Sequence, residues 1–260
     1  MRRRARRLSV VAALCLCCVA NGAAARGRRP RFEPTDLELE DSGTAEFDLQ
    51  AGPAIGGSDA GNRFVVPDLE VDLGLLPNVE FDVDAALAVD HFDGSHPTLD
   101  GEAIWTSMKL GLADTHNAKS DYNFAAGLQL GPRLPTVGTR GLGYAGLALL
   151  GLAKERLHLV GNIGAIVDPG EHITSGQAKS FVAGLDLDLD LDGRDAWSLI
   201  GELATALYVS DDPNELTMTG GFAYNVLPSL ELSAILLAGF LPGGDRGAIL
   251  FGVSPKVALW

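Results

Sequence analysis

The sequence predicts an all-β protein, an antiparallel up-and-down transmembrane β-barrel of about 12 strands. Apolar and polar residues alternate over many short segments, turn residues separate these segments at a steady spacing, and an export signal precedes them. Alternation sends successive side chains to opposite faces of a strand. In Val79–Asp84 every carboxylate is flanked by an apolar residue. The sequence offers no second layer of secondary structure to cover the apolar face of the sheet. We therefore expect lipid to cover this face.

Residues 1–25 have the pattern of a cleavable signal peptide. Five arginines open the segment, Leu8–Ala20 is an apolar run too short for a spanning helix, and Ala23–Ala25 offers a small-residue cleavage site. All three cysteines of the chain lie in this segment. The mature chain would therefore have no thiol for a disulfide, a metal or a nucleophile.

The rest of the chain is strongly acidic. The net charge is −14, and it becomes −19 once the five arginines of residues 1–25 are removed, because that segment has no acid. Nucleic-acid phosphates would repel such a chain, so we expect no nucleic-acid partner. Many of the acids lie in the middle of predicted strands, between leucines and valines, rather than in a tail.

Residues 26–42 change from basic to acidic and contain prolines, so we expect a loosely ordered N-terminal segment there, followed by a barrel over residues 43–260. Each predicted strand has close to the roughly 9–11 residues that a tilted strand needs to cross a bilayer. The predicted strands are Thr44–Ile55, Arg63–Leu75, Val79–Asp90, Glu102–Ala113, Tyr122–Leu134, Gly141–Ala153, Arg156–Val167, Ala178–Leu191, Trp197–Val209, Glu215–Val226, Ser229–Leu241 and Gly247–Leu259.

The connections alternate in length. Tight turns at residues 76–78, 154–155 and 227–228 follow even-numbered predicted strands, whereas longer polar links mostly follow odd-numbered ones. Short periplasmic turns and longer outer loops are typical of outer-membrane barrels. Two connections depart from this pattern, because residues 114–121 form a long link on the turn side and residues 242–246 form a short one on the loop side.

The alternation also assigns faces, with valine, leucine and phenylalanine toward lipid and charged residues toward the lumen. Two segments, Gly141–Ala153 and Ser229–Leu241, are apolar on much of both faces and give no clear assignment. The predicted lumen-lining residues are Asp68, Glu70, Asp72, Glu80, Asp82, Asp84, Lys109, Arg133, Asp186, Asp188, Asp190 and Glu202.

The block Arg63–Asp82 has the pattern R-x-x-x-P-x-x-E-x-x-x-G-L, then a short turn and an acidic strand. It resembles the early hairpin of a bacterial outer-membrane family described as meta-pathway phenol-degradation proteins or outer-membrane transporters. The resemblance implies an outer-membrane barrel that moves small hydrophobic or aromatic solutes. Trp260 supplies the terminal aromatic residue usual in barrels, but its parity differs from that of Val257. Either a bulge lies near Pro255 or Trp260 lies beyond the strand.

Three motifs match cofactor or metal sites only in part. Asp188–Gly193 begins like a calcium loop, but Leu199 stands where the twelfth-position acid is needed. Gly141–Gly146 matches a dinucleotide fingerprint but follows a loop instead of a strand. His91, with Asp93 and His96, could hold a metal, but loop spacing fixes no geometry and a solvated loop is the favoured interpretation. We expect no cofactor, no metal and no catalytic residue.

The predicted function is passive diffusion of small solutes, cations or neutral molecules, through an acidic lumen. The expected partners are outer-membrane lipid, the barrel-assembly machinery and a small-molecule solute. Three alternatives stay open: a non-conducting structural barrel, a soluble secreted β-sandwich, and an outer-membrane hydrolase. The hydrolase would use acids at the outer rim together with His172. The candidate acids are Asp168, Glu171, Asp211 and Asp212.

Overall fold

The computed structural model describes residues 39–56, 61–91, 97–101, 103–114, 123–136, 139–170, 176–193 and 196–260. The predicted signal peptide, most of the N-terminal segment, Asp93, His96, Glu171 and His172 lie outside these ranges. In the described part of the chain, no helix is long and apolar enough to span a membrane.

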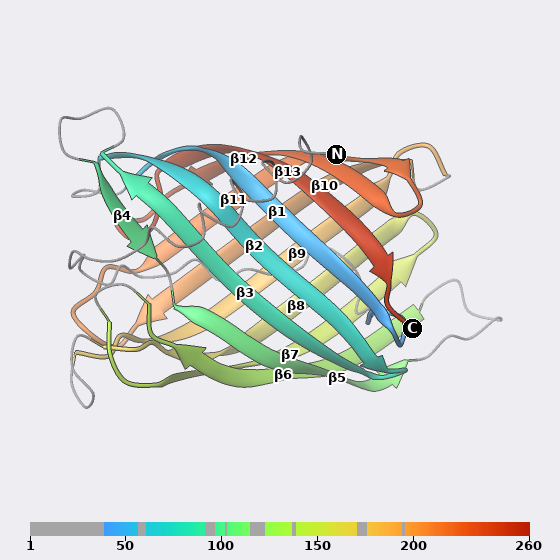
Figure 1. The fold of residues 1–260 in the computed structure, drawn as a ribbon, viewed down its shortest axis with the longest axis horizontal. Coiled ribbons are helices and arrows are strands. Elements are labelled where there is room, and N and C mark those ends of the chain that lie inside the picture. The colour runs from blue at the N-terminus through green and yellow to red at the C-terminus, as the bar shows by residue number, and fades with distance from the viewer. Residues whose placement is uncertain are drawn as a thin grey trace, which may run out of the picture.

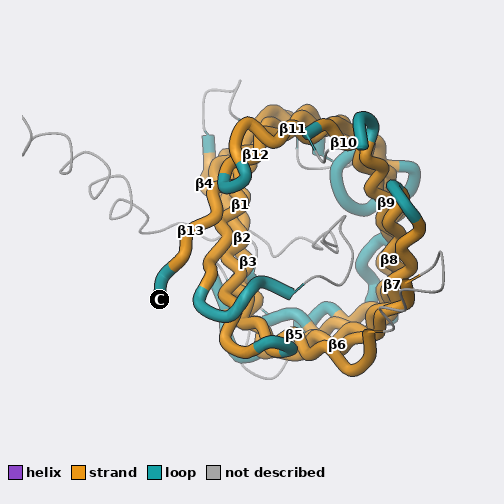
Figure 2. Tube along the Cα trace, turned by 90° about the vertical axis from the view of Figure 1, so that its right-hand side faces the viewer, coloured by secondary structure: helices purple, strands orange, loops and turns teal. Residues whose placement is uncertain are grey.

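The described strands form one closed antiparallel barrel (Figures 1 and 2). Strands that follow one another in the chain pair, except that β4 and β5 both pair with β3, and β1 pairs with β13 to close the wall. Such a closed single sheet contradicts the alternative of a β-sandwich. The strands are β1 Thr44–Ile55, β2 Asn62–Leu76, β3 Val79–Asp90, β4 Thr98–Gly101, β5 Ile104–Asp114, β6 Asn123–Leu134, β7 Gly143–Lys154, β8 Leu157–Val167, β9 Lys179–Asp190, β10 Trp197–Tyr208, β11 Glu215–Leu227, β12 Leu230–Gly239 and β13 Gly247–Ala258.

The prediction of about twelve strands is confirmed, and the structure adds one short strand, β4. The edge of β3 pairs with β4 near Asp90 and with β5 near Val79, so β4 and β5 share one position in the wall. The strand predicted at Glu102–Ala113 is β5, and the short strand β4 lies where the sequence predicted a loop before it. The bounds of the other strands agree with the prediction to within two residues.

The two ends of the barrel differ as predicted. Two-residue turns at 77–78, 155–156 and 228–229 lie at the end where β1 begins, which we call the turn end. The other end, which we call the loop end, carries the connections 56–61, 91–97, 135–142, 168–178, 209–214 and 240–246.

The C-terminal strand resolves the ambiguity at Trp260. The pairing of β13 with β1 keeps one register from Gly247 to Ala258, so Pro255 introduces no bulge there. Trp260 lies beyond the end of β13 and is 73% exposed. The terminal aromatic side chain thus projects from the turn end.

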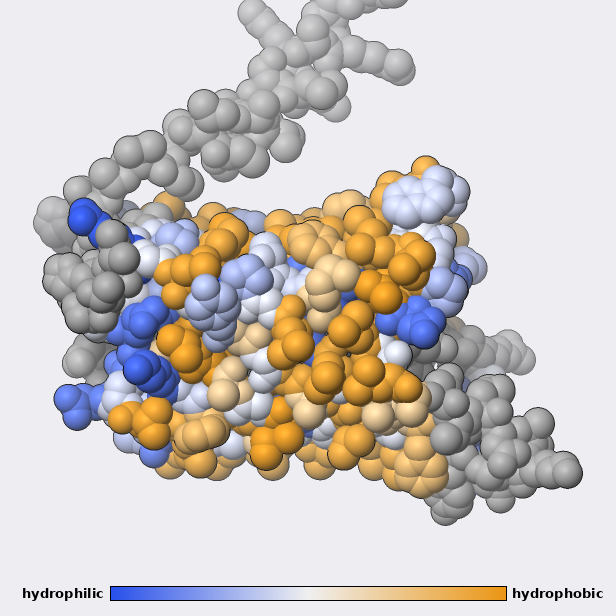
Figure 3. Space-filling model, turned by 90° about the horizontal axis from the view of Figure 1, so that it is seen from below, coloured by the Kyte–Doolittle hydropathy of each residue, from blue (hydrophilic) through white to orange (hydrophobic). Residues whose placement is uncertain are grey.

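The outer face of the barrel is a broad apolar band with polar residues toward both ends (Figure 3). Alternate strand positions contribute large exposed side chains, among them Leu150, Ile163, Phe181, Leu236 and Phe251. Trp197 and Tyr224 stack at the turn end, with ring centroids 4.3 Å apart. An apolar band flanked by aromatic residues is the surface expected of a wall that faces lipid.

At some strand positions the neighbouring backbone lies so close that only glycine fits. Gly131 in β6 is the clearest example. A Cβ built there would lie 1.9 Å from the carbonyl oxygen of Thr106 and 2.6 Å from Cα of Ser107. We expect Gly131→Ala to destabilise the barrel by about 1–3 kcal/mol, because backbone must move. Gly220→Ala is the matched control, since a Cβ at Gly220 meets nothing within 4 Å. Equal unfolding midpoints for the two variants would contradict the prediction.

Candidate functional site

The inner face of the wall has two zones along the barrel axis. From the turn end to the middle it is mainly acidic, and toward the loop end apolar clusters, which we call the apolar zone, lie among individually paired charges. The apolar zone includes one buried cluster on β5 and β7–β10, formed by Trp105, Ala145, Leu147, Leu149, Ile166, Val182, Ala204 and Ala206. A second cluster on β1, β2, β12 and β13 is formed by Ala54, Val65, Leu237, Ala248 and Leu250.

All twelve predicted lumen residues lie on the side of the wall opposite the apolar band. Glu70, Asp188 and Glu202 are partly buried. The remaining nine are at most 8% exposed: Asp68, Asp72, Glu80, Asp82, Asp84, Lys109, Arg133, Asp186 and Asp190.

Strand register places the acids beside one another. Glu46 faces Asp72, Asp72 faces Asp82, and Asp82 faces Ser107, so three carboxylates form one row across β1, β2 and β3. On the other side of the barrel, which Figure 2 shows across the lumen from β3, Asp186 of β9 faces Glu202 of β10. Like charges directly opposite one another destabilise a sheet unless they are neutralised.

Two lysines supply positive charge in and beside this row, Lys109 at the neighbouring Glu80 and Lys256 at Glu46. Nζ of Lys109 lies 2.7 Å from Oε1 of Glu80, and the two residues are 3% and 1% exposed. The second oxygen of Glu80, Oε2, accepts a hydrogen bond of 2.5 Å from the backbone N–H of Glu40. Lys256 forms ion pairs with Glu40 and Glu46, at 2.7 and 3.2 Å. Two lysines thus pair with acids of three chain segments at the turn end: β3, β1 and the segment before β1.

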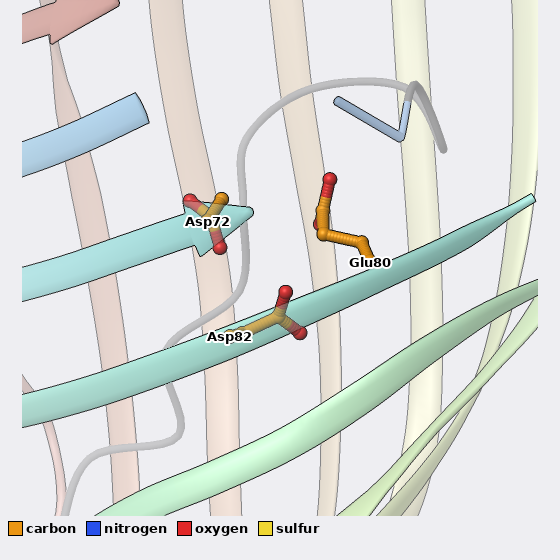
Figure 4. A group of neighbouring side chains, drawn as sticks. All are labelled: Asp72, Glu80 and Asp82. Carbon is orange, nitrogen blue, oxygen red and sulfur yellow. The ribbon is translucent and has the colours of Figure 1, made fainter. Parts of the chain in front are cut away.

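Asp72, Glu80 and Asp82 form the tightest acidic group among the described residues (Figure 4). Their carboxylate oxygens lie within 4.8 Å of one another. Asp82 accepts hydrogen bonds from Ser107 at 3.0 Å and from Gln129 at 2.9 Å. Such oxygens could hold a hard divalent cation. The ammonium group of Lys109 already supplies positive charge at this point.

The loop-end half pairs its charges individually. Nε of Arg133 donates to Oδ1 of Asp168 at 2.5 Å. Tyr208 donates to Glu215 at 3.2 Å. Arg63 lies 3.6 Å from Asp245. The acids Glu215 and Asp245 are only 2% exposed, and no alternation in the sequence marked them as inner residues.

Asp190 has a local role. Its Oδ1 accepts hydrogen bonds from the backbone N–H groups of Asp192 and Gly193, at 3.0 and 2.8 Å. Gly193 has a positive φ of 68°, which suits glycine in a tight turn. The partial calcium motif is therefore a strand end followed by a turn, as its missing twelfth acid indicated.

No protein-family model and no curated protein matches the sequence. Among solved structures, the chain is similar to an outer-membrane channel from Pseudomonas putida F1, with a TM-score of 0.59 and 13% identity. The match covers 87% of this chain and all of that one. The NanC porin matches with a TM-score of 0.53 and 10% identity, over 81% of this chain and 100% of the porin. At these identities the likeness establishes the fold, a closed barrel of the kind found in outer-membrane channels.

Proposed function

We propose that the protein is an outer-membrane channel for small solutes, exported by its signal peptide and inserted by the barrel-assembly machinery. In a soluble barrel the apolar outer band would be exposed to water, which is unfavourable. The band therefore supports insertion in lipid. The similarity to channel structures supports the class of function. We assign no residue a catalytic role.

One observation carries the proposal: acids on facing sides of the lumen outnumber inner bases. Asp72 and Asp82 stand on one side, and Asp186 and Glu202 on the other. Charge of one sign along a pore selects against ions of that sign. Twelve strands also give a lumen between the filled eight-stranded barrel and the open sixteen-stranded porin. We therefore propose a narrow channel that favours cations and neutral solutes.

The solute class is part of the proposal. The resemblance of Arg63–Asp82 to the phenol-degradation family supports hydrophobic or aromatic solutes. The buried apolar cluster around Trp105 and Leu147, near the loop end, supports the same choice. An apolar solute entering at the loop end would meet this cluster before it reached the acid row of Asp72 and Asp82.

Neutralising Asp186, Asp188 and Glu202 together, to Asn, Asn and Gln, is expected to lower the cation-to-anion permeability ratio markedly. The reason is that these acids supply the negative potential of one side of the lumen. Reversal potentials in planar bilayers under a salt gradient measure the ratio.

The matched control removes three acids at the ends of the barrel. Glu155, Asp211 and Asp212 lie in connections, so neutralising them should leave the reversal potential nearly unchanged. The proposal fails if the inner and outer triple variants have the same selectivity.

A non-conducting barrel is the second candidate, and one observation favours it. Inner acids such as Glu80 and Asp186 are 1% and 0% exposed, which is unusual for the wall of an open pore. Single-channel recording separates the two functions, because a filled barrel gives no current steps.

A further inference from the structure

We propose that an apolar solute leaves the lumen sideways, through the wall between β4 and the end of β6, and enters the surrounding lipid without passing the acid row. The inference rests on the apolar solute class proposed above and names the route that such a solute takes. An interrupted strand ladder, a side-chain link across the interruption and apolar residues on both faces of the wall support it.

The backbone ladder of the wall is interrupted near the loop end. β4 pairs with β3 over Thr98–Gly101, and no other described strand pairs with β4. β5 follows β4 along β3 and pairs with β6 from Ile104, which faces Leu134 at the end of β6 (Figure 1). The wall is therefore continuous from the turn end to Ile104. Beyond it, β4 lies beside residues 134–136, and we call this place the joint.

The sequence explains why the ladder of β6 stops at the joint. Pro135 directly follows β6 and has no backbone N–H to donate to a neighbouring strand. The backbone of Thr136 bonds within its own turn. Its N–H donates to Oγ1 of Thr139 at 3.0 Å, and its carbonyl oxygen accepts from the N–H of Thr139 at 3.3 Å. Neither Pro135 nor Thr136 therefore donates a ladder bond to β4.

A side-chain hydrogen bond links the two sides of the joint. Oγ1 of Thr136 donates to the carbonyl oxygen of Gly101 at 2.7 Å. A Cβ built at Gly101 would lie 3.6 Å from Cβ of Thr136, so the two sides are in contact and the joint is closed. Rotation of one threonine side chain breaks such a link, whereas a strand ladder opens only when several backbone bonds break together.

Apolar side chains lie on both faces of the wall beside the joint. Trp105, the second residue of β5, belongs to the buried inner cluster with Leu147 and Ile166. On the outer face, Leu134 and Tyr144 are 36% and 59% exposed. An apolar solute that moves from the inner cluster through the joint therefore stays against apolar groups until it reaches lipid.

The route along the barrel axis is unfavourable for the same solute. Toward the turn end the lumen is lined by charged groups that bind one another. Asp82 accepts hydrogen bonds from Ser107 and Gln129, and Lys109 pairs with Glu80. An apolar solute among these groups would separate them from their partners or from water and return no hydrogen bond. Exit through the joint avoids this cost.

A disulfide across the joint tests the route. Gly101→Cys with Thr136→Cys places the two Cβ atoms about 3.6 Å apart, which suits a disulfide, and the predicted mature chain has no other cysteine. We expect oxidation to abolish most uptake of radiolabelled naphthalene by whole cells, and dithiothreitol to restore it. Ion conductance in planar bilayers should be the same in both forms. Whole cells are used because naphthalene crosses a bare phospholipid bilayer unaided.

Asn78→Cys with Gly111→Cys is the matched control. Their Cβ atoms would lie about 3.5 Å apart, but this pair lies at the turn end, where the N–H of Gly111 already donates to the carbonyl oxygen of Asn78 at 3.0 Å. Oxidation of the control pair should leave both naphthalene uptake and ion conductance at the wild-type level.

Thr136→Val tests the joint without thiol chemistry. The variant removes the hydroxyl that bonds to Gly101 at nearly constant volume. We expect it to raise naphthalene uptake several-fold, because the two sides separate more easily, and to leave ion conductance unchanged.

Two results would overturn the lateral route. One is equal naphthalene uptake by the oxidised and reduced forms of the Gly101–Thr136 pair. The other is a parallel loss of uptake and conductance on oxidation, which would show that the solute follows the barrel axis. Conductance also separates this inference from the proposed function. A wild-type chain that passes ions but takes up no naphthalene keeps the channel and rejects the route, whereas disulfide-sensitive uptake without current steps supports the route and rejects the channel.

Discussion

Lys109→Met is expected to destabilise the barrel by about 3–5 kcal/mol, because it removes one partner of a buried ion pair. Lys109 lies 2.7 Å from Glu80, and both are almost fully buried. Without the ammonium group, the carboxylate of Glu80 loses its cationic partner while it stays next to Asp72 and Asp82, whose oxygens lie within 4.8 Å. Equilibrium unfolding by urea in lipid vesicles measures the change in free energy.

Two further variants control this prediction. Lys256→Met makes the same chemical change at a lysine side chain that is 40% exposed, so the loss should be about 0–1 kcal/mol. The double variant Lys109→Met with Glu80→Gln should regain much of the lost stability, because the uncompensated charge is gone. A Lys109 variant no less stable than the Lys256 variant would show that the pair contributes little.

The second large effect concerns the outer face, where Leu203→Arg should destabilise the barrel by about 2–4 kcal/mol. Leu203 lies in the middle of β10, and its cross-strand neighbours Leu185 and Met218 are also about half exposed. An arginine there would place its charge at the centre of the proposed bilayer. Unfolding in lipid vesicles again provides the measurement.

The control is the same substitution at an outward residue near the end of the barrel, away from the centre of the proposed bilayer. Val209 is 69% exposed and follows directly after β10 at the loop end. Val209→Arg should therefore change stability by only about 0–1 kcal/mol, as expected near a membrane interface. Surface substitutions in a soluble protein usually stay within about 0.5 kcal/mol. If both variants fell in that range, the apolar band would not face lipid.

The local pattern of the sequence was sufficient to predict the strands and their order. Period-two alternation depends only on the extended backbone, so β1 and β3 could be bounded to the residue and the acids of β3 assigned to one face. The alternation of short and long connections likewise follows from antiparallel neighbours. β7 was harder to assign because it is apolar on both faces, with Leu149 buried inside and Leu150 exposed outside.

Only the tertiary structure decided which of these residues meet. Register between strands depends on long-range pairing and on bulges, which a local period does not encode. The irregularity between Val65 and Asp68 in β2 allows both residues to face inward despite their opposite parity. The same long-range pairing joins Asp72 to Asp82 and brings Glu40 to Glu80. Sequence alone therefore determined a barrel with an acidic inner face, and the closure of the sheet determined how its charges are matched.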